Sequence, residues 1–140
     1  MTVGSAYRVF ISHASEDTWV ARQLAVHIEK AGGRSFLDAV DIERGDDFED
    51  RILAALEECD ELLVLFTKPA VKSRYVWLEI GKFWGRRITA ALHGISIKEI
   101  QSDAHMPVLL KRTNLVHLNE IDAYFAELGV RIEQRGKDVG

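Results

Sequence analysis

The feature that most constrains this chain is a repeated change between two apolar periodicities. Short β-rich runs alternate with segments whose apolar residues recur every three or four positions, which is typical of an α/β fold with a parallel sheet. The runs predicted as strands are Tyr7–Ile11, Arg34–Leu37, Glu61–Phe66, Ile88–Leu92 and Asn114–Leu118. We therefore expect a flavodoxin-like three-layer sandwich around a five-stranded parallel sheet.

Capping and breaking residues predict where the helices begin and end. The expected starts are Ser15, Asp46 (with Glu49 as a capping box), Ser73, Pro107 and Asn119. The pair Gly32-Gly33 is expected to end the first helix, and the third helix is expected to run from Ser73 to about Arg86.

Length and composition limit the class of protein. A chain of 140 residues with 47% hydrophobic and 29% charged residues is expected to form one domain over 1–140, with flexible termini at about 1–6 and 136–140. The net charge of −4 argues against a nucleic-acid surface. A lone cysteine, Cys59, no signal-peptide pattern and no apolar run that could span a bilayer together predict a cytoplasmic protein without membrane association.

Polar residues follow the predicted strands at their carboxyl ends, where sheets of this kind bind ligands. They are Ser12, His13, Asp38, Thr67 and His93. Neither a G-x-G-x-x-G nor a P-loop motif is present, so these two kinds of nucleotide site are excluded. A phospho-acceptor receiver would need an aspartate at the end of the central strand, which instead ends Leu65-Phe66-Thr67. The five histidines never form a close pair with a third ligand, so we expect no metal site.

The third predicted helix carries a glutamate in an informative position. On a helical wheel, Val76, Ile80 and Phe83 form the core-facing side, with Trp77 and Trp84 flanking it on one side. Tyr75 and Glu79, four residues apart, flank it on the other side. Glu79 is therefore expected at the edge of the buried face with an aromatic ring beside it, although the wheel alone leaves open an ordinary surface glutamate.

Several segments together resemble the bacterial type of the Toll/interleukin-1 receptor (TIR) domain family over essentially the whole chain. Tyr7–Asp17 is similar to the family's opening box, and Phe36-Leu37-Asp38 with Ile42–Asp46 resembles its second strand and BB loop. Tyr75–Gly81 resembles the helix that carries the catalytic glutamate of NAD⁺-cleaving members. One departure is Tyr75, because the family commonly has tryptophan four residues before that glutamate; tyrosine can stack as well.

The resemblance implies an enzyme that cleaves the nicotinamide–ribose bond of NAD⁺, giving nicotinamide and ADP-ribose or a cyclic product. It implies Glu79 as the catalytic residue, no cofactor besides the NAD⁺ substrate, and activation by self-association with other TIR domains in prokaryotic immune or antiphage signalling. The expected substrate contacts are Ser12, His13, Asp38 and Tyr75, and the expected assembly loop includes Ile42, Arg44 and Gly45.

Three of these residues also have a simpler interpretation. Ser12 could cap the first helix, His13 could be an exposed loop histidine at the strand end, and Asp38 could close a turn. Two other functions stay open for the chain as a whole: a TIR interaction module without turnover, and a deoxyribosyltransferase-like enzyme acting on nucleosides. Release of nicotinamide from NAD⁺ would separate the first of these from an NAD⁺ hydrolase or cyclase.

Overall fold

The order and direction of the strands decide where a site can lie. The computed structural model describes residues 6–37, 48–102 and 114–139. Its strands are β1 (Arg8–Ser12), β2 (Arg34–Leu37), β3 (Glu61–Phe66), β4 (Arg87–Leu92) and β5 (Asn114–His117). Every neighbouring pair is parallel, in the order β2-β1-β3-β4-β5. The predicted five-stranded parallel sheet is confirmed.

Helices connect the strands and cover both faces of the sheet. They are α1 (Thr18–Lys30), α3 (Phe48–Glu58), α4 (Lys68–Val71), α5 (Arg74–Lys82), α6 (Ile97–Ser102) and α8 (Asp122–Val139), with the 3₁₀ turns η1 (Ser15–Asp17) and η2 (Leu118–Glu120). Helix α8 extends to Val139 and so includes most of the segment 136–140, for which the sequence predicts a flexible end. In the described part of the chain, no helix has the length and apolarity needed to cross a membrane.

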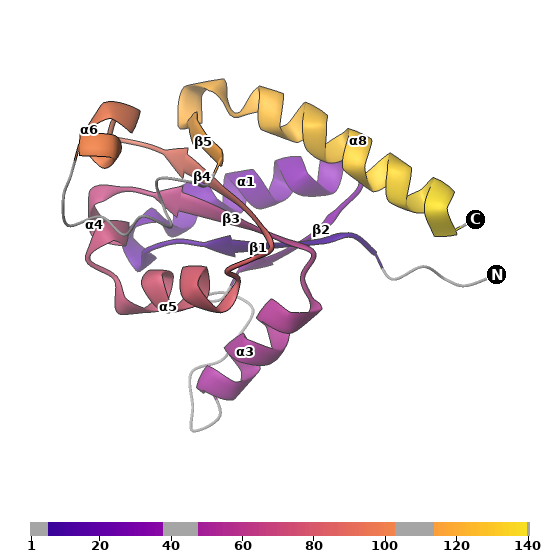
Figure 1. Cartoon of the computed structure of the whole chain (residues 1–140), viewed down its shortest axis with the longest axis horizontal. Helices are drawn as coiled ribbons and strands as arrows, with labels where there is room; N and C mark the ends of the chain where they lie inside the picture. The colour runs from indigo at the N-terminus through magenta and orange to yellow at the C-terminus, as the bar shows by residue number, and fades with distance from the viewer. Residues whose placement is uncertain (1–5, 38–47, 103–113, 140) are drawn as a thin grey trace.

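Alternation along the strands divides the core into two layers. In β1, Val9 and Ile11 pack with residues of α1 and α8, whereas Phe10 packs with residues of α3, α4, α5 and α6. Figure 1 shows α1 and α8 on one side of the sheet and α3 and α5 on the other. Because side chains alternate between faces along a strand, Ser12 lies on the same face as Phe10, toward α5.

Two predicted helix caps are wrong. Ser15 begins the turn η1, its hydroxyl donates to Glu16 Oε1 at 3.2 Å, and α1 starts only at Thr18. Asn119 lies inside the turn η2, ahead of α8. In both places the chain makes a 3₁₀ turn before the α-helix begins. Such turns are common at helix starts, and a capping pattern in the sequence does not show whether a 3₁₀ turn or an α-helix follows the cap. The predicted starts at Asp46 and Pro107 lie outside the described residues.

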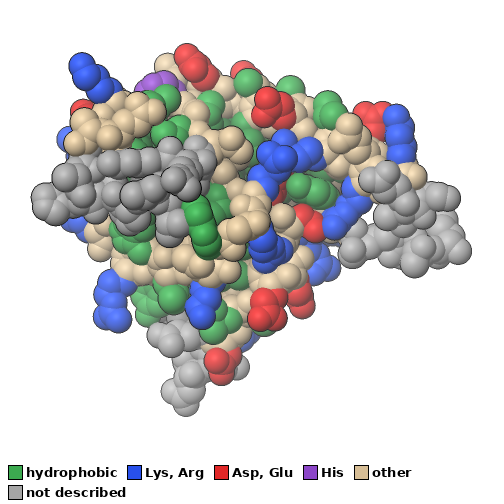
Figure 2. All heavy atoms as spheres, viewed as in Figure 1, with side chains coloured by type: hydrophobic (Ala, Val, Ile, Leu, Met, Phe, Trp, Pro, Cys, Tyr) green, Lys and Arg blue, Asp and Glu red, His purple; other side chains and the backbone are tan. Residues whose placement is uncertain are grey.

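The surface carries charges of both signs. On the face drawn in Figure 2, Lys and Arg side chains are intermixed with Asp and Glu side chains and with exposed hydrophobic groups. The described part of this face therefore offers no continuous basic field of the kind that binds a phosphate backbone.

Candidate active site

Strands β1 and β3 end side by side, and helices α4 and α5 follow β3 from there. We call this the carboxyl end of the sheet. Thr67 follows β3 and begins α4, because its Oγ1 accepts a hydrogen bond from the Ala70 amide at 3.2 Å. Ser73 begins α5 in the same way, with its Oγ accepting from the Val76 amide at 3.3 Å. The Thr67 cap begins α4 and the Ser73 cap begins α5, so α5 starts where the sequence predicts.

Helix α5 presents a glutamate to the protein interior. Val76, Glu79, Ile80 and Phe83 follow the three-four spacing of a single helical face, and none has more than 1% of its surface exposed. The sequence predicts Glu79 at the edge of this face, but the structure places it within the buried stripe, with an exposed fraction of 0%. An ordinary surface glutamate is thereby excluded. A wholly buried glutamate is rare, because removing a carboxylate from water is costly unless hydrogen bonds compensate.

The Glu79 carboxylate is joined to the end of β1. The Ser12 hydroxyl donates a short hydrogen bond to Glu79 Oε1, linking two residues that are 67 positions apart. Ser12 is also buried, with an exposed fraction of 0%. The hydroxyl therefore does not cap the first helix. Two of the predicted site residues, Ser12 and Glu79, are in direct contact.

His13 and its neighbours form a second polar cluster at the same end of the sheet. The sequence predicts an exposed His13, but the side chain is buried at 4% exposure, and its Nε2 lies 3.4 Å from Thr18 Oγ1. Nearby in the fold, Thr67 Oγ1 donates to Asp17 Oδ2 at 2.5 Å and so joins the segments that follow β3 and β1. The sequence predicts Thr67 at a strand end, but it does not predict the contact with Asp17. Asp17 is one of two acidic residues in the turn η1, which follows β1. This pair of acids is the feature of the sequence that could have indicated a partner for Thr67.

The aromatic residues of α5 have different surroundings. Tyr75 is 41% exposed, whereas Trp77 points inward, where its Nε1 donates to the Val71 carbonyl at 2.7 Å and its ring meets Phe66 edge-on. Trp84 is exposed. A depression of about 590 Å³ lies over this part of α5, and its described lining is Arg74, Tyr75, Trp77 and Leu78. Glu79 is not part of that lining, so the depression is not itself the pocket around the carboxylate.

The remaining predicted site residues, Asp38, Ile42, Arg44 and Gly45, lie outside the described residues. Among the side chains that are described, no group of three or more His, Cys, Asp or Glu is arranged to hold a metal ion.

The opposite, amino end of the sheet buries another glutamate, which sequence analysis did not single out. Glu61 begins β3 with an exposed fraction of 0%, and Arg131 Nη2 of α8 donates to both of its carboxylate oxygens, at 3.0 and 2.9 Å. Burial acts to lower the pKa of Arg131, but the hydrogen bond to Glu61 and the Glu61 charge, together with Tyr7, outweigh burial, and the pKa is raised. Burial and then the Glu61 charge raise the pKa values of Tyr7 and Tyr124. The surroundings of Glu61 thus hold it in an ion pair.

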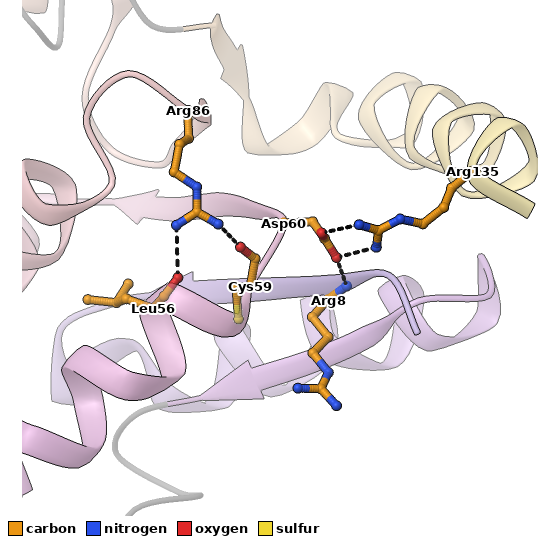
Figure 3. Close-up of polar contacts among 6 residues, drawn as sticks. All are labelled: Arg8, Leu56, Cys59, Asp60, Arg86 and Arg135. Carbon is orange, nitrogen blue, oxygen red and sulfur yellow. Dashed lines mark hydrogen bonds and ion pairs between the residues drawn. The ribbon is translucent and has the colours of Figure 1, made fainter. Parts of the chain in front are cut away.

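Figure 3 shows the polar contacts beside this ion pair. The Asp60 carboxylate accepts two hydrogen bonds from Arg135, at 2.5 and 2.6 Å, and one from the Arg8 amide at 2.8 Å. Arg86 donates to the carbonyls of Leu56 and Cys59 at the end of α3. Each of these hydrogen bonds joins the end of a helix or strand to a segment that is distant in the sequence. We therefore interpret these contacts as structural.

The chain matches a known protein family over most of its length and a named plant protein over part of its length. A family model described as TIR domain matches residues 9–129. A probable 2′ cyclic ADP-D-ribose synthase of Brachypodium distachyon is 38% identical over 78 residues, which are 54% of this chain and 35% of the plant protein. The chain thus spans about a third of that relative's length.

Solved structures agree on the fold. The TIR domain of the Toll-related receptor TRR-2 of Hydra magnipapillata has a TM-score of 0.68 at 21% identity, covering 89% of this chain and 97% of the receptor domain. The TIR domains of the activated Roq1 resistosome have a TM-score of 0.60 at 16% identity, covering 91% and 83%. A prokaryotic SEFIR domain has a TM-score of 0.60 at 20% identity, covering 91% and 92%.

Proposed function

The chain belongs to the TIR domain family, and from that premise we propose that it cleaves the nicotinamide–ribose bond of NAD⁺ with Glu79 as the catalytic carboxylate. The observation that carries the proposal is the wholly buried Glu79, which accepts a hydrogen bond from Ser12 at the carboxyl end of a parallel sheet. This is the end where such sheets bind ligands. The plant relative, named as a probable 2′ cyclic ADP-D-ribose synthase, supports the same chemistry.

The reaction suits a single carboxylate. Glycosidases usually need a second acid to protonate a poor leaving group. In NAD⁺ the leaving group is a cationic pyridinium, so the electron pair of the breaking C1′–N bond neutralises it and nicotinamide departs without a proton. What remains is positive charge developing on the ribose, which a fixed carboxylate in a dry site stabilises strongly.

The second half of the reaction decides the product. Water that attacks C1′ gives ADP-ribose, and its proton passes to Glu79 or to solvent. A nucleophile within the same molecule gives a cyclic isomer. Because Glu79 has no exposed surface, the side chains that cover it must move before the ribose can reach the carboxylate. Tyr75, exposed and one helical turn before Glu79, is proposed to contact the substrate as that opening forms.

The direct test is nicotinamide release from NAD⁺ by concentrated protein, wild type against Glu79→Gln. Glutamine keeps the shape of the side chain and an oxygen to accept from Ser12, so only the charge is lost. We expect the rate to fall on the order of 10²-fold or more with unchanged circular dichroism. Glu133→Gln, at an exposed position on α8, serves as the matched control and should have wild-type activity. Near wild-type cleavage by a folded Glu79→Gln protein would remove Glu79 from the mechanism. An inactive wild type would favour an interaction module.

We further propose that activity depends on self-association through the loop that contains Ile42, Arg44 and Gly45, in an immune signalling role. The resemblance motivates this, as does the Roq1 neighbour, whose TIR domains belong to an activated resistosome. Specific activity should then rise with protein concentration alongside light scattering, and Ile42→Asp or Arg44→Glu should lower it. A flat specific activity from a monomer would contradict the assembly proposal alone.

A further inference from the structure

The residue that holds Glu79, Ser12, lies at the end of an inner strand of the sheet. Strand β1 is hydrogen-bonded on both sides, to β2 and to β3, and its last residue, Ser12, is in register with Val64 of β3. Ser12 faces the α5 side of the sheet, and its exposed fraction is 0%. A side chain placed by its pairing with β3 and by burial has little freedom to follow a ligand.

The direction of the hydrogen bond limits what else Ser12 can do. A serine hydroxyl has one proton, and in this structure that proton is donated to Glu79 Oε1. It is therefore not available to a phosphate or ribose oxygen while the contact persists.

We propose that Ser12 is a positioning residue for Glu79, and not the substrate contact that the sequence suggests. This inference rests on the proposed function, because it assigns Ser12 a role only through a catalytic Glu79. The hydroxyl fixes one carboxylate oxygen and so restricts rotation of the group. The bond adds no formal charge, so it orients the carboxylate without neutralising it, as stabilisation of a cationic transition state requires.

A positioning role predicts a specific kinetic signature. Ser12→Ala should lower kcat by about 10-fold to 10²-fold, since misplacing a reacting group by about 1 Å costs up to that much. KM for NAD⁺ should stay within about two-fold of wild type, because Ser12 makes no contact with the substrate. Ser12→Cys, nearly isosteric but a weak donor, should show the same loss with the packing kept. Ser12→Thr retains the hydroxyl and should recover most of kcat.

The matched control is a serine that makes a similar bond elsewhere. Ser35 of β2 donates to Glu29 Oε2 of α1 at 2.8 Å, again from a strand to a helical glutamate, but in an exposed setting. Ser35→Ala should leave both kcat and KM unchanged. All variants are compared at equal folded concentration, verified by circular dichroism and thermal unfolding, so that a loss of kcat is not a loss of folded protein.

The outcomes separate this inference from the proposed function. Reduced kcat with unchanged KM in Ser12→Ala and Ser12→Cys, restored in Ser12→Thr, supports the positioning role. A raised KM with unchanged kcat would make Ser12 a substrate contact, and unchanged kinetics would make it structural; either result overturns the inference and leaves Glu79 catalytic. If Glu79→Gln itself cleaves NAD⁺ normally, the proposed function has failed at its own test.

Discussion

The glutamates buried at the two ends of the sheet, Glu61 and Glu79, are held by different chemistry. Both have an exposed fraction of 0%. At the amino end, Glu61 accepts two hydrogen bonds from the guanidinium of Arg131, so that its charge is matched. At the carboxyl end, Glu79 accepts a hydrogen bond from the neutral hydroxyl of Ser12, which orients the carboxylate and contributes no charge of its own.

The two settings point to different roles, a structural one for Glu61 and, under the proposed function, a catalytic one for Glu79. The buried ion pair between Glu61, at the start of a strand, and Arg131, on a long helix, joins α8 to the sheet. At the other end of the sheet, where ligands bind, the Ser12 hydroxyl orients the Glu79 carboxylate. The Glu61–Arg131 pair should therefore matter for stability, and Glu79 should matter for turnover.

The largest expected effect comes from breaking the amino-end pair. Arg131→Met leaves Glu61 buried without its cation and should lower the free energy of unfolding by about 3–5 kcal/mol, measured in urea. The exposed pair between Arg8 and Glu58 is the control, and Arg8→Ala should cost at most about 1 kcal/mol.

A compensating change sharpens this result. The double variant Arg131→Met with Glu61→Leu replaces the whole pair by apolar groups and should recover most of the stability. A single Arg131→Met variant as stable as wild type would show that the pair does not hold α8 to the sheet.

A smaller effect is expected at the aromatic residues of α5. Tyr75→Ala should lower kcat/KM for NAD⁺ by about 10-fold, since an aromatic stacking contact contributes on the order of 1 kcal/mol, and Tyr75→Trp should retain activity. Trp77→Phe loses the hydrogen bond to the Val71 carbonyl and should cost about 1 kcal/mol of stability at little cost in activity. Equal activity losses in folded Tyr75→Ala and Trp77→Phe proteins would contradict this division.

The smallest expected effect is a loss of stability at alkaline pH, caused by Cys59 at the amino end of the sheet. Burial, followed by the charge of Asp60, raises the pKa of the Cys59 thiol from 9.0 to about 12. The folded state thus holds this proton more tightly than the unfolded state, and the stabilisation is complete below about pH 9 and is lost as the pH rises toward 12. Between pH 8 and pH 10 the loss from Cys59 is about 1 kcal/mol. Cys59→Ala should show a shallower decline, measured by urea unfolding at each pH; an identical decline would exclude the thiol as its source.

Local sequence patterns were sufficient to predict the strands of the sheet, but not the partners of the two buried glutamates. The apolar run at Glu61–Phe66 and the wheel of α5 predicted a central strand and an inward helix face, because period and burial are local properties. The partners of the two buried glutamates lie 67 and 70 residues away, at Ser12 and Arg131, and no spacing encodes such contacts. The wheel placed Glu79 at an edge because it took the buried face from the apolar residues alone, whereas the tertiary contact with Ser12 compensates for the burial of the carboxylate.

The most direct test measures the two buried glutamates side by side. Nicotinamide release and the free energy of unfolding are determined for wild type, Glu79→Gln and Glu61→Gln, with rates taken per folded molecule. We predict that Glu79→Gln loses at least about 10²-fold in rate and changes stability by less than about 1 kcal/mol. Glu61→Gln should lose stability, because Arg131 is left without its carboxylate, and keep its rate. A Glu79→Gln protein that releases nicotinamide at the wild-type rate, or a Glu61→Gln protein that is folded and inactive, would contradict the assignment of catalysis to the carboxyl end of the sheet.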